Sequence, residues 1–289
     1  MKQGPITPKG FRDTLPEVVK KRREIFGKIA MVLEDYGFVP LETPSVEYAD
    51  TLLGKYGEEE KLIYQFTDRG GRKLALRYDL TVPLARFVAN NLKLLNPTFS
   101  RYQIGQVFRG ENPQRGRFRE FTQFDFDIVG KIDTNEDARV IAAAIIAARK
   151  IGLEKSRMAV NDRRVFSALS VEDIRAIDKI YKVGKDNTEK RLVDFVENQK
   201  PTENLKKLFN ILEEKYDLKL DQDFFFDPTL ARGQDYYTGT IMELKPNGRP
   251  EEMSIGGGGR YDNLIGTFAN RPIPAVGFSF GIDRLLEIT

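Results

Sequence analysis

The stretch FRGENPQRGRFREFTQFDFDIVG, residues 108–130, predicts more of the fold than any other part of the chain. Its second half alternates strictly between apolar and polar residues, as a β-strand with one face in a core requires. The apolar face carries Phe124, Phe126 and Ile128. The opposite face carries Gln123, Asp125 and Asp127. Because a central strand needs partners for its polar side chains, we predict that this acidic face is the floor of a pocket for a cationic or amphoteric small molecule.

The first half of the same stretch is rich in arginine and predicts a polyphosphate site. Arg109 ends the first strand of an expected hairpin, and Glu111, Arg115 and Arg117 lie in or beside its loop at 110–117. Guanidinium groups match pairs of phosphate oxygens, so Arg109 and Arg117 could clamp a nucleotide. The alternative is a ladder of cross-strand ion pairs on a solvated sheet face. The neighbouring phenylalanines favour a central strand and therefore the ligand site.

Three further segments carry chemical signals. LARGQDYYTGTIMEL (230–244) places an arginine close to two tyrosines and two glycines, although a tyrosine pair in a core would look the same. In AVGFSFGIDRLLEI (275–288), one strand face is nearly bare, which predicts a slot for a flat ring with Arg284 at its mouth. Tight helix–strand packing would explain those glycines but not the arginine. SIGGGGRYD (254–262) fits neither a P-loop nor a dinucleotide-binding fingerprint.

The amino-acid composition excludes several kinds of catalytic and metal site. The chain has 289 residues, a net charge of +3, and neither cysteine nor histidine. A conventional structural zinc site, a Ser–His or Cys–His nucleophile and an imidazole acid or base are therefore excluded. Phosphoryl or nucleotidyl transfer suits the remaining groups, because positioning and charge neutralisation dominate such reactions. No apolar run is long enough for a membrane span, and no signal peptide is visible.

The order of elements predicts an α+β fold, with an antiparallel sheet flanked by helices. Helices are expected at 16–36, 81–92 and 136–153, and a strand at 73–79. The hairpin strands are expected at 102–109 and 118–129. Residues 163–226 change to short charged helices and are interpreted as a small helical insertion. The remaining core would then consist of residues 1–162 and 227–289.

These segments, in this order, resemble the histidyl-tRNA synthetase family of class II aminoacyl-tRNA synthetases. FVPLETPSVE (38–47) resembles motif 1, the stretch RYQIGQVFRGENPQRGRFREFTQFDFDIVG (101–130) motif 2, and VGFSFGIDRLLE (276–287) motif 3. LRYDLTVPLAR (76–86) and LARGQDYYTG (230–239) resemble the two histidine-specific segments, and PKGFRD (8–13) the N-terminal signature. The resemblance spans nearly the whole chain.

The resemblance implies activation of histidine by ATP and Mg²⁺, with transfer to the acceptor stem of tRNA(His). Mg²⁺ would be carried by the ATP. The implied catalytic residues are Arg109, Arg232 and Arg284. The implied ATP-binding residues are Arg109, Glu111, Arg117, Gly281 and Arg284. The implied histidine-binding residues are Asp79, Thr81, Gln123, Asp127, Tyr236 and Tyr237. Gln114 and Arg115 would reach the tRNA acceptor end.

The sequence ends at Thr289, directly after the motif 3-like segment. We therefore expect a catalytic domain without the anticodon-binding domain that full-length relatives carry. A homodimer in the cytoplasm is expected from the same resemblance. The alternative function is a histidine-sensing regulatory paralogue, such as the regulatory subunit of ATP phosphoribosyltransferase. Such paralogues usually lose the catalytic arginines, and here Arg109, Arg232 and Arg284 are all present.

Overall fold

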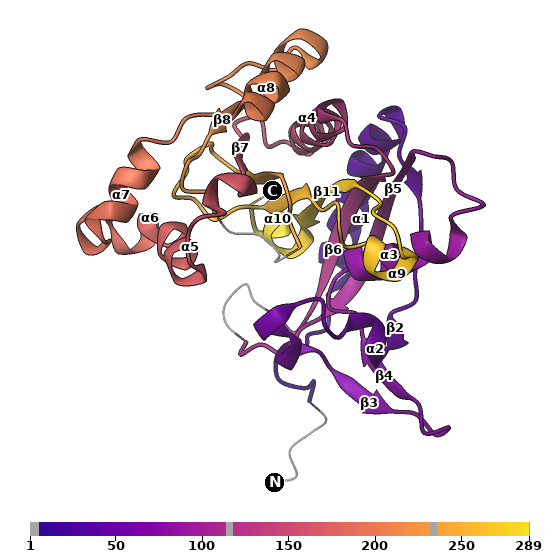
Figure 1. The fold of residues 1–289 in the computed structure, drawn as a ribbon. Helices are drawn as coiled ribbons and strands as arrows, with labels where there is room; N and C mark the ends of the chain where they lie inside the picture. Colours follow the sequence, from indigo (N-terminus) through magenta and orange to yellow (C-terminus); the bar gives the residue numbers. More distant parts are fainter. Residues whose placement is uncertain (1–5, 114–117, 232–235, 289) are drawn as a thin grey trace.

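A twisted eight-stranded sheet forms the centre of the computed structural model, which describes residues 6–113, 118–231 and 236–288 (Figure 1). In spatial order its strands are β1 (Val39–Pro40), β5 (Phe99–Phe108), β6 (Glu120–Val129), β11 (Ala275–Gly281), β10 (Gly256–Arg260), β9 (Thr240–Lys245), β7 (Arg157–Asp162) and β8 (Phe224–Phe226). Only the outer pairs β1–β5 and β7–β8 are parallel. The predicted α+β fold with an antiparallel sheet is confirmed.

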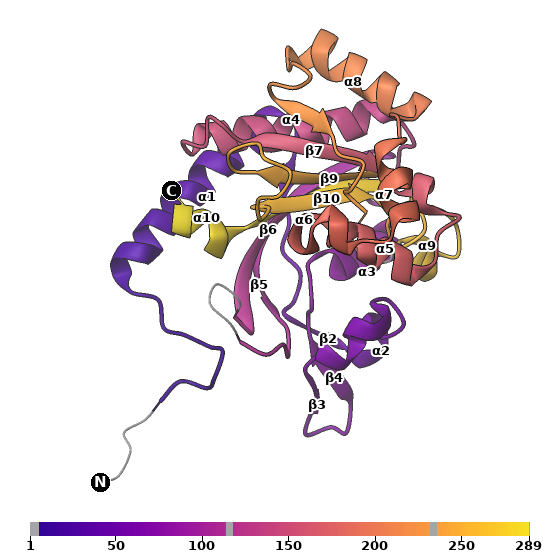
Figure 2. The ribbon, with the colours of Figure 1, turned by 90° about the vertical axis from the view of Figure 1, so that its left-hand side faces the viewer.

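Helices that are distant in sequence cover one face of this sheet (Figure 2). They are α1 (Pro16–Asp35), α4 (Thr134–Lys150), α8 (Glu203–Tyr216) and α10 (Ile282–Ile288). The apolar face of β6 packs beneath them, with Phe124 and Phe126 fully buried. Residues 123–128 therefore alternate as predicted, and the acidic face of β6 points away from this core.

A second set of elements lies on the acidic side of the sheet. Helix α3 (Thr81–Asn91) packs against α9 (Gly266–Ala269) in a separate apolar cluster. A three-stranded sheet extends from it, composed of β2 (Val46–Tyr48), β4 (Lys73–Leu76) and β3 (Gln65–Thr67). The helices α2 (Ala49–Leu52) and η1 (Gly57–Leu62) accompany this sheet (Figure 1). The sheet and helices bring the segment 56–81 beside β6.

The range 163–226 is helical over most of its length. It contains η2 (Arg163–Phe166), α5 (Val171–Asp178), α6 (Ile180–Val183), η3 (Lys185–Asn187) and α7 (Lys190–Glu197). Several of these pack around a third apolar cluster. By contrast α8 packs against α4 in the main core, and β8 pairs with β7 of the main sheet. The division into a core at 1–162 and 227–289 and an insertion at 163–226 stays a prediction.

Local signals account for the ends of α4. The Asp133 carboxylate accepts a hydrogen bond from the Asn135 backbone N–H (3.0 Å), which caps the first turn. Arg149 and Lys150 lie in the last turn, where positive charge is favourable. Among the described residues, no helix is both long enough and apolar enough to cross a membrane.

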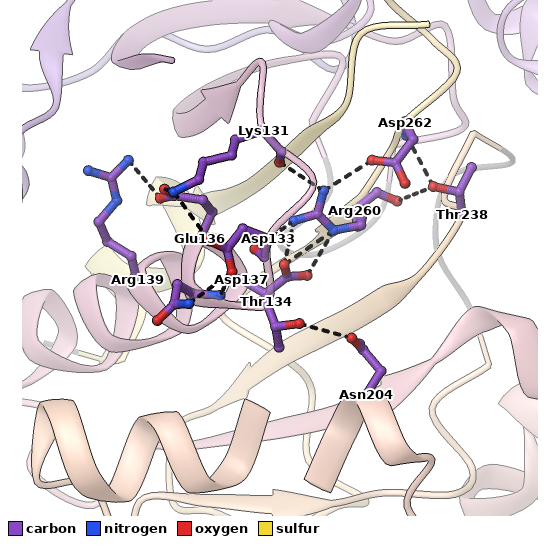
Figure 3. A network of polar contacts seen from close by, with 11 residues as sticks. Lys131, Asp133, Thr134, Glu136, Asp137, Arg139, Asn204, Thr238, Arg260 and Asp262 are labelled. Carbon is purple, nitrogen blue, oxygen red and sulfur yellow. Dashed lines mark hydrogen bonds and ion pairs between the residues drawn. The ribbon is translucent and has the colours of Figure 1, made fainter. Parts of the chain in front are cut away.

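A buried ion-pair network joins the start of α4 to the end of β10 (Figure 3). The Arg260 guanidinium pairs with the Asp137 carboxylate and reaches Asp262 (3.1 Å). It also donates to the carbonyls of Lys131 and Asp133. Burial raises the pKa of Asp137, and the ion pair with Arg260 opposes that rise. The network holds the end of β10, an inner strand of the sheet, against α4.

We expect Arg260→Met to lower the free energy of unfolding by about 3–5 kcal/mol, because it leaves a buried carboxylate without its cation. Urea unfolding followed by far-ultraviolet circular dichroism measures this change. Arg191→Ala is the control, since Arg191 forms an exposed pair with Asp173 and its loss should change the free energy of unfolding far less. Adding Asp137→Leu to Arg260→Met should recover most of the loss. Equal effects of the two arginine substitutions would contradict this account.

Candidate active site

A cavity of about 410 Å³ opens on the acidic side of the sheet. Its size lies within the range of small-molecule sites. Its walls come from η1, the start of α3, the hairpin β5–β6, the segment before β9, and the junction of β11 with α10. Elements from both halves of the chain therefore meet at this cavity.

One row of residues across the sheet forms the floor. The strand register aligns Asp125 of β6 with Ser279 of β11, Ser279 with Gly257 of β10, and Gly257 with Glu243 of β9. All four residues line the cavity. The predicted floor of the pocket is thus one continuous row, with acids at its two ends and small residues between them.

Glycines beside the floor are present for different reasons. A Cβ on Gly258 would lie 2.1 Å from the Gly277 carbonyl oxygen, and a Cβ on Gly277 would lie 1.9 Å from Asp127 Oδ1. Packing within the protein therefore requires glycine at these two positions. On Gly281 the closest atom, the Ile255 carbonyl oxygen, would be 3.6 Å away, which is an ordinary contact. Because Gly281 lines the cavity, its missing side chain leaves room for a ligand.

Asp79 gives the cavity a buried carboxylate at the start of α3. Its Oδ1 accepts hydrogen bonds from the Tyr56 hydroxyl (3.0 Å) and from the backbone N–H groups of Thr81 (3.1 Å) and Val82 (3.0 Å). Its Oδ2 is buried and has no hydrogen-bond partner among the described residues. Burial raises the pKa of Asp79, and the three donors oppose that rise. The unused oxygen is suited to an ammonium donor.

Asp125 and Gln123 add two more polar groups on the same strand face. The Gln123 side-chain N–H donates to the Ser279 hydroxyl (3.0 Å), and its Oε1 is a buried acceptor without a partner. Asp125 Oδ1 is likewise buried and unpartnered among the described residues. Burial raises the pKa of Asp125 to about 7, and the neighbouring Asp127 contributes to that rise. A cationic ligand would offset the energetic cost of burying the charged Asp125 carboxylate.

Asp127 lies in a smaller recess that adjoins the main cavity. Its Oδ2 forms an ion pair with Arg101 (2.7 Å), and its Oδ1 accepts the Tyr261 hydroxyl (2.5 Å). Both partners are buried. The recess shares Thr81, Asp125 and other lining residues with the main cavity, whereas Asp127 lines only the recess.

Tyr236 and Tyr237 form the wall above the floor. Their rings meet edge to face at 5.2 Å, and the Tyr236 ring meets that of Tyr261 at 5.7 Å. Thr81 lies beside them as a lining residue. Burial raises the pKa of both hydroxyls of the pair, so both are donors at neutral pH. The recess is therefore bounded by aromatic rings and acidic groups together.

Arginines from two distant segments also line the cavity, together with the acidic residues Glu59, Glu111 and Asp283. Arg109 Nε donates to the Tyr78 carbonyl (3.2 Å), and its guanidinium lies over the rings of Tyr78 (4.3 Å) and Phe121 (5.1 Å). Arg284 Nη1 donates to the Ser254 carbonyl (2.8 Å). Glu111 lies with them on the cavity wall. Two arginines from distant segments thus face the same space, as the sequence predicted.

Part of the predicted site lies outside the described residues: Gln114, Arg115, Arg117 and Arg232. The other predicted residues line the cavity, or in the case of Asp127 the adjoining recess. Sequence reasoning missed Tyr56, Glu59, Glu243 and Tyr261, and it gave Asp125 no role beyond the floor. Tyr261 lies in the SIGGGGRYD segment, whose glycines could have indicated its place beside the floor.

No group of three carboxylates among the described residues is arranged to hold a metal ion. The cavity instead combines a recess with acidic and aromatic walls, suited to an ammonium group and a flat ring, with a mouth lined by arginines. Such an arrangement can hold a cationic amino acid next to a polyphosphate.

The family model for histidyl-tRNA synthetase matches residues 10–181 and 171–285. The histidine–tRNA ligase of Aeropyrum pernix is 42% identical over 98% of this chain and 74% of its own length. The crystal structure of histidyl-tRNA synthetase from Nostoc sp. PCC 7120 superposes with a TM-score of 0.82 at 30% identity, covering 99% of this chain and 75% of that one.

A structure from Bacillus halodurans C, described as an ATP phosphoribosyltransferase regulatory subunit/histidyl-tRNA synthetase, has a TM-score of 0.80 at 27% identity. It covers 98% of this chain and 82% of that one. The family match, the identity to the ligase of Aeropyrum pernix and the arrangement of the cavity agree with one another. The chain belongs to the histidyl-tRNA synthetase family, within the class II aminoacyl-tRNA synthetases.

Proposed function

We propose that this protein joins histidine to ATP to form histidyl-adenylate and then transfers the histidyl group to tRNA(His). The observation that carries the proposal is the pairing of Arg109 and Arg284 on the wall of the cavity that also holds Asp79 and Asp125. Binding of an amphoteric amino acid beside a triphosphate needs this division of charge. Family membership supplies the identity of the amino acid and of the tRNA.

In the first step, the histidine carboxylate attacks the α-phosphorus of ATP, and pyrophosphate leaves. The attacking carboxylate is already ionised at neutral pH, so the step requires no general base. The protein has to bring two anions together and stabilise the charge that develops on the phosphate. Arg109 and Arg284 are placed for this work, with Arg117 and Arg232 as further proposed contributors. Mg²⁺ would accompany the ATP and neutralise part of its charge.

Histidine would occupy the inner end of the cavity. The oxygens of Asp79, Gln123 and Asp125 that have no partner among the described residues are acceptors for its ammonium group. Asp127 and the tyrosines Tyr236 and Tyr237 would enclose the imidazole. In the second step, a hydroxyl at the 3′ end of tRNA attacks the histidyl carbonyl and releases AMP. Gln114 and Arg115 are the residues proposed to contact that end.

A homodimer and a cytoplasmic location remain proposals. Apolar side chains at Val39, Val46 and Tyr48 are between 38% and 57% exposed, and they belong to or follow the motif 1-like segment. A second copy related by a two-fold axis would cover them. The cytoplasmic location rests on the role of the family in protein synthesis.

The alternative is a regulatory subunit that senses histidine, as the description of the structure from Bacillus halodurans C allows. Such a protein would need the acidic end of the cavity but not the arginines at its mouth. The presence of Arg109 and Arg284 on the cavity wall favours the enzyme.

The first test is histidine-dependent exchange of labelled pyrophosphate into ATP. We expect exchange in the parent protein and a loss of about 10²–10³-fold in kcat/KM for Arg109→Ala, because one charge-stabilising donor is removed. Arg249→Ala is the control, since that side chain is exposed and away from the cavity. No exchange by the parent above a blank without histidine would reject the enzyme and leave the regulatory alternative.

A second test uses the space at Gly281. We expect Gly281→Val to raise the KM for ATP by at least about tenfold, because the new side chain would enter the proposed nucleotide slot at little cost to the fold. Its effect on histidine binding, measured by calorimetry without ATP, should be small. Gly27→Val is the control, because a Cβ at that helix position meets no atom of the described residues within 4 Å apart from its own helix backbone and its chain neighbours. An unchanged KM for ATP would remove Gly281 from the site.

A third test uses the pKa of Asp125, which is raised to about 7. As the pH rises through 7, Asp125 becomes a carboxylate and should attract the ammonium group of histidine more strongly. The ratio of the Kd for histidine in Asp125→Asn to that in the parent should be near one at pH 6. It should grow to about tenfold by pH 8, as expected for one charge-assisted hydrogen bond. Titration of the free histidine cancels in this ratio, and a ratio that is flat with pH would contradict the role.

A further inference from the structure

Arg101 is an arginine with no exposed surface that lies behind the recess holding Asp127. It belongs to β5, directly opposite Asp127 in the strand register. Its Nη2 forms the 2.7 Å ion pair with Asp127 Oδ2. Arg101 does not line the cavity or the recess, so it can act on a ligand only through the residues it touches.

The other contacts of Arg101 reach both sides of the recess. Its Nη2 lies 3.4 Å from the Leu80 carbonyl, between the cavity residues Asp79 and Thr81. Its Nη1 lies 3.5 Å from the Asp125 carbonyl. One guanidinium thus joins the wall at 79–81 to the floor at 125–127. These longer contacts are weak singly, so the ion pair carries most of the interaction.

A buried arginine is a costly way to hold a sheet together. Desolvating two charges consumes much of their attraction, and apolar replacements often give equal or greater stability. The Nε of Arg101 also remains buried without a hydrogen-bond partner among the described residues. Stability alone is therefore a poor explanation for this residue. Its direct contact is with a carboxylate that lines the recess.

Arg101 favours the ionised form of the Asp127 carboxylate, which acts as a hydrogen-bond acceptor and is called the acceptor form here. Burial raises the pKa of Asp127, while the ion pair with Arg101 and the Tyr261 hydroxyl oppose that rise. An ionised carboxylate only accepts hydrogen bonds, whereas a protonated one also donates. The acceptor form selects a ring that carries an N–H group. It leaves an unsatisfied buried acceptor when the ring has none.

We propose that Arg101 is a positioning residue for amino-acid specificity, which holds Asp127 as a fixed acceptor so that the recess selects a ring bearing an N–H donor. This inference rests on the proposed function, because it takes histidine as the ligand of the recess. Arg101 itself contacts no substrate atom. Among the described residues no ion pair with the Asp125 side chain is found, so the two acids of one strand face serve different purposes.

The test compares Arg101→Lys with Arg86→Lys. Arg86 forms an ion pair with the buried Glu47 (2.7 Å) and does not line the cavity, so its substitution reports the structural cost of such a change. A lysine at 101 keeps the charge but cannot reproduce the planar fork. We expect Arg101→Lys to raise the KM for histidine by about tenfold, equivalent to the loss of about 1.4 kcal/mol. The KM for ATP and the kcat should change less than twofold, and Arg86→Lys should leave all three unchanged.

The selectivity for histidine over another amino acid is a measurement that a purely structural role of Arg101 would not change. The probe is 3-(2-thienyl)alanine, whose ring has a similar size and no N–H donor. The parent should prefer histidine strongly in the exchange reaction, and the preference should fall by about tenfold in Arg101→Lys. The double variant Arg101→Met with Asp127→Leu should regain stability, because it replaces both buried charges with apolar side chains and removes the acceptor. It should not regain the preference.

The outcomes distinguish a failure of the proposed function from a failure of the role of Arg101. If the parent neither binds nor activates histidine, the proposed function fails. If the parent is active while Arg101→Lys keeps its KM for histidine and its preference within twofold, the role of Arg101 is overturned. Recovery of the preference in the double variant would also overturn it, because Asp127 would then not be the acceptor that Arg101 positions.

Discussion

The structure depends on the opposite chemistry of the two buried faces of β6. One face contributes Phe124 and Phe126 to the main core, and the other contributes Gln123, Asp125 and Asp127 to the cavity. A shift of one residue in the pairing of β6 would place the acids in the core and the phenylalanines in the site. Folding and formation of the site are therefore set by the same strand register.

Much of this arrangement could be predicted from the sequence because the signals were local. Strict alternation at 123–128 indicated the strand and its two faces. Arg109 directly follows strand β5, and Arg284 lies in the first turn of the helix that follows strand β11. The resemblance to histidyl-tRNA synthetases then placed these segments around one ligand. Asp79 shows what local pattern could not give, since its capping of the first turn of α3 became visible only with coordinates.

Some of the missed contacts run across the sheet, and the pattern along one strand does not show which residue lies opposite on the next. Arg101 reads as an ordinary strand residue until the register places it opposite Asp127. Gly257 and Gly258 are neighbours in one glycine run, yet only the second is required by close backbone packing. Likewise α8 belongs by its charged composition with α5–α7, but its apolar stripe packs on α4. In each case the role of the residue or helix depends on the neighbouring strand or helix that it packs against.

The two aspartates of β6 illustrate how one strand face can perform two tasks. They are two residues apart and equally buried, so burial alone would raise the pKa of both. Asp127 has an arginine and a tyrosine hydroxyl as partners, while Asp125, which lines the cavity, has an oxygen without a partner among the described residues. Because their surroundings differ, Asp127 is a carboxylate with fixed partners, whereas Asp125 requires a cationic ligand as its partner. For that reason we expect the binding of the ammonium group, more than recognition of the ring, to depend on pH near neutrality.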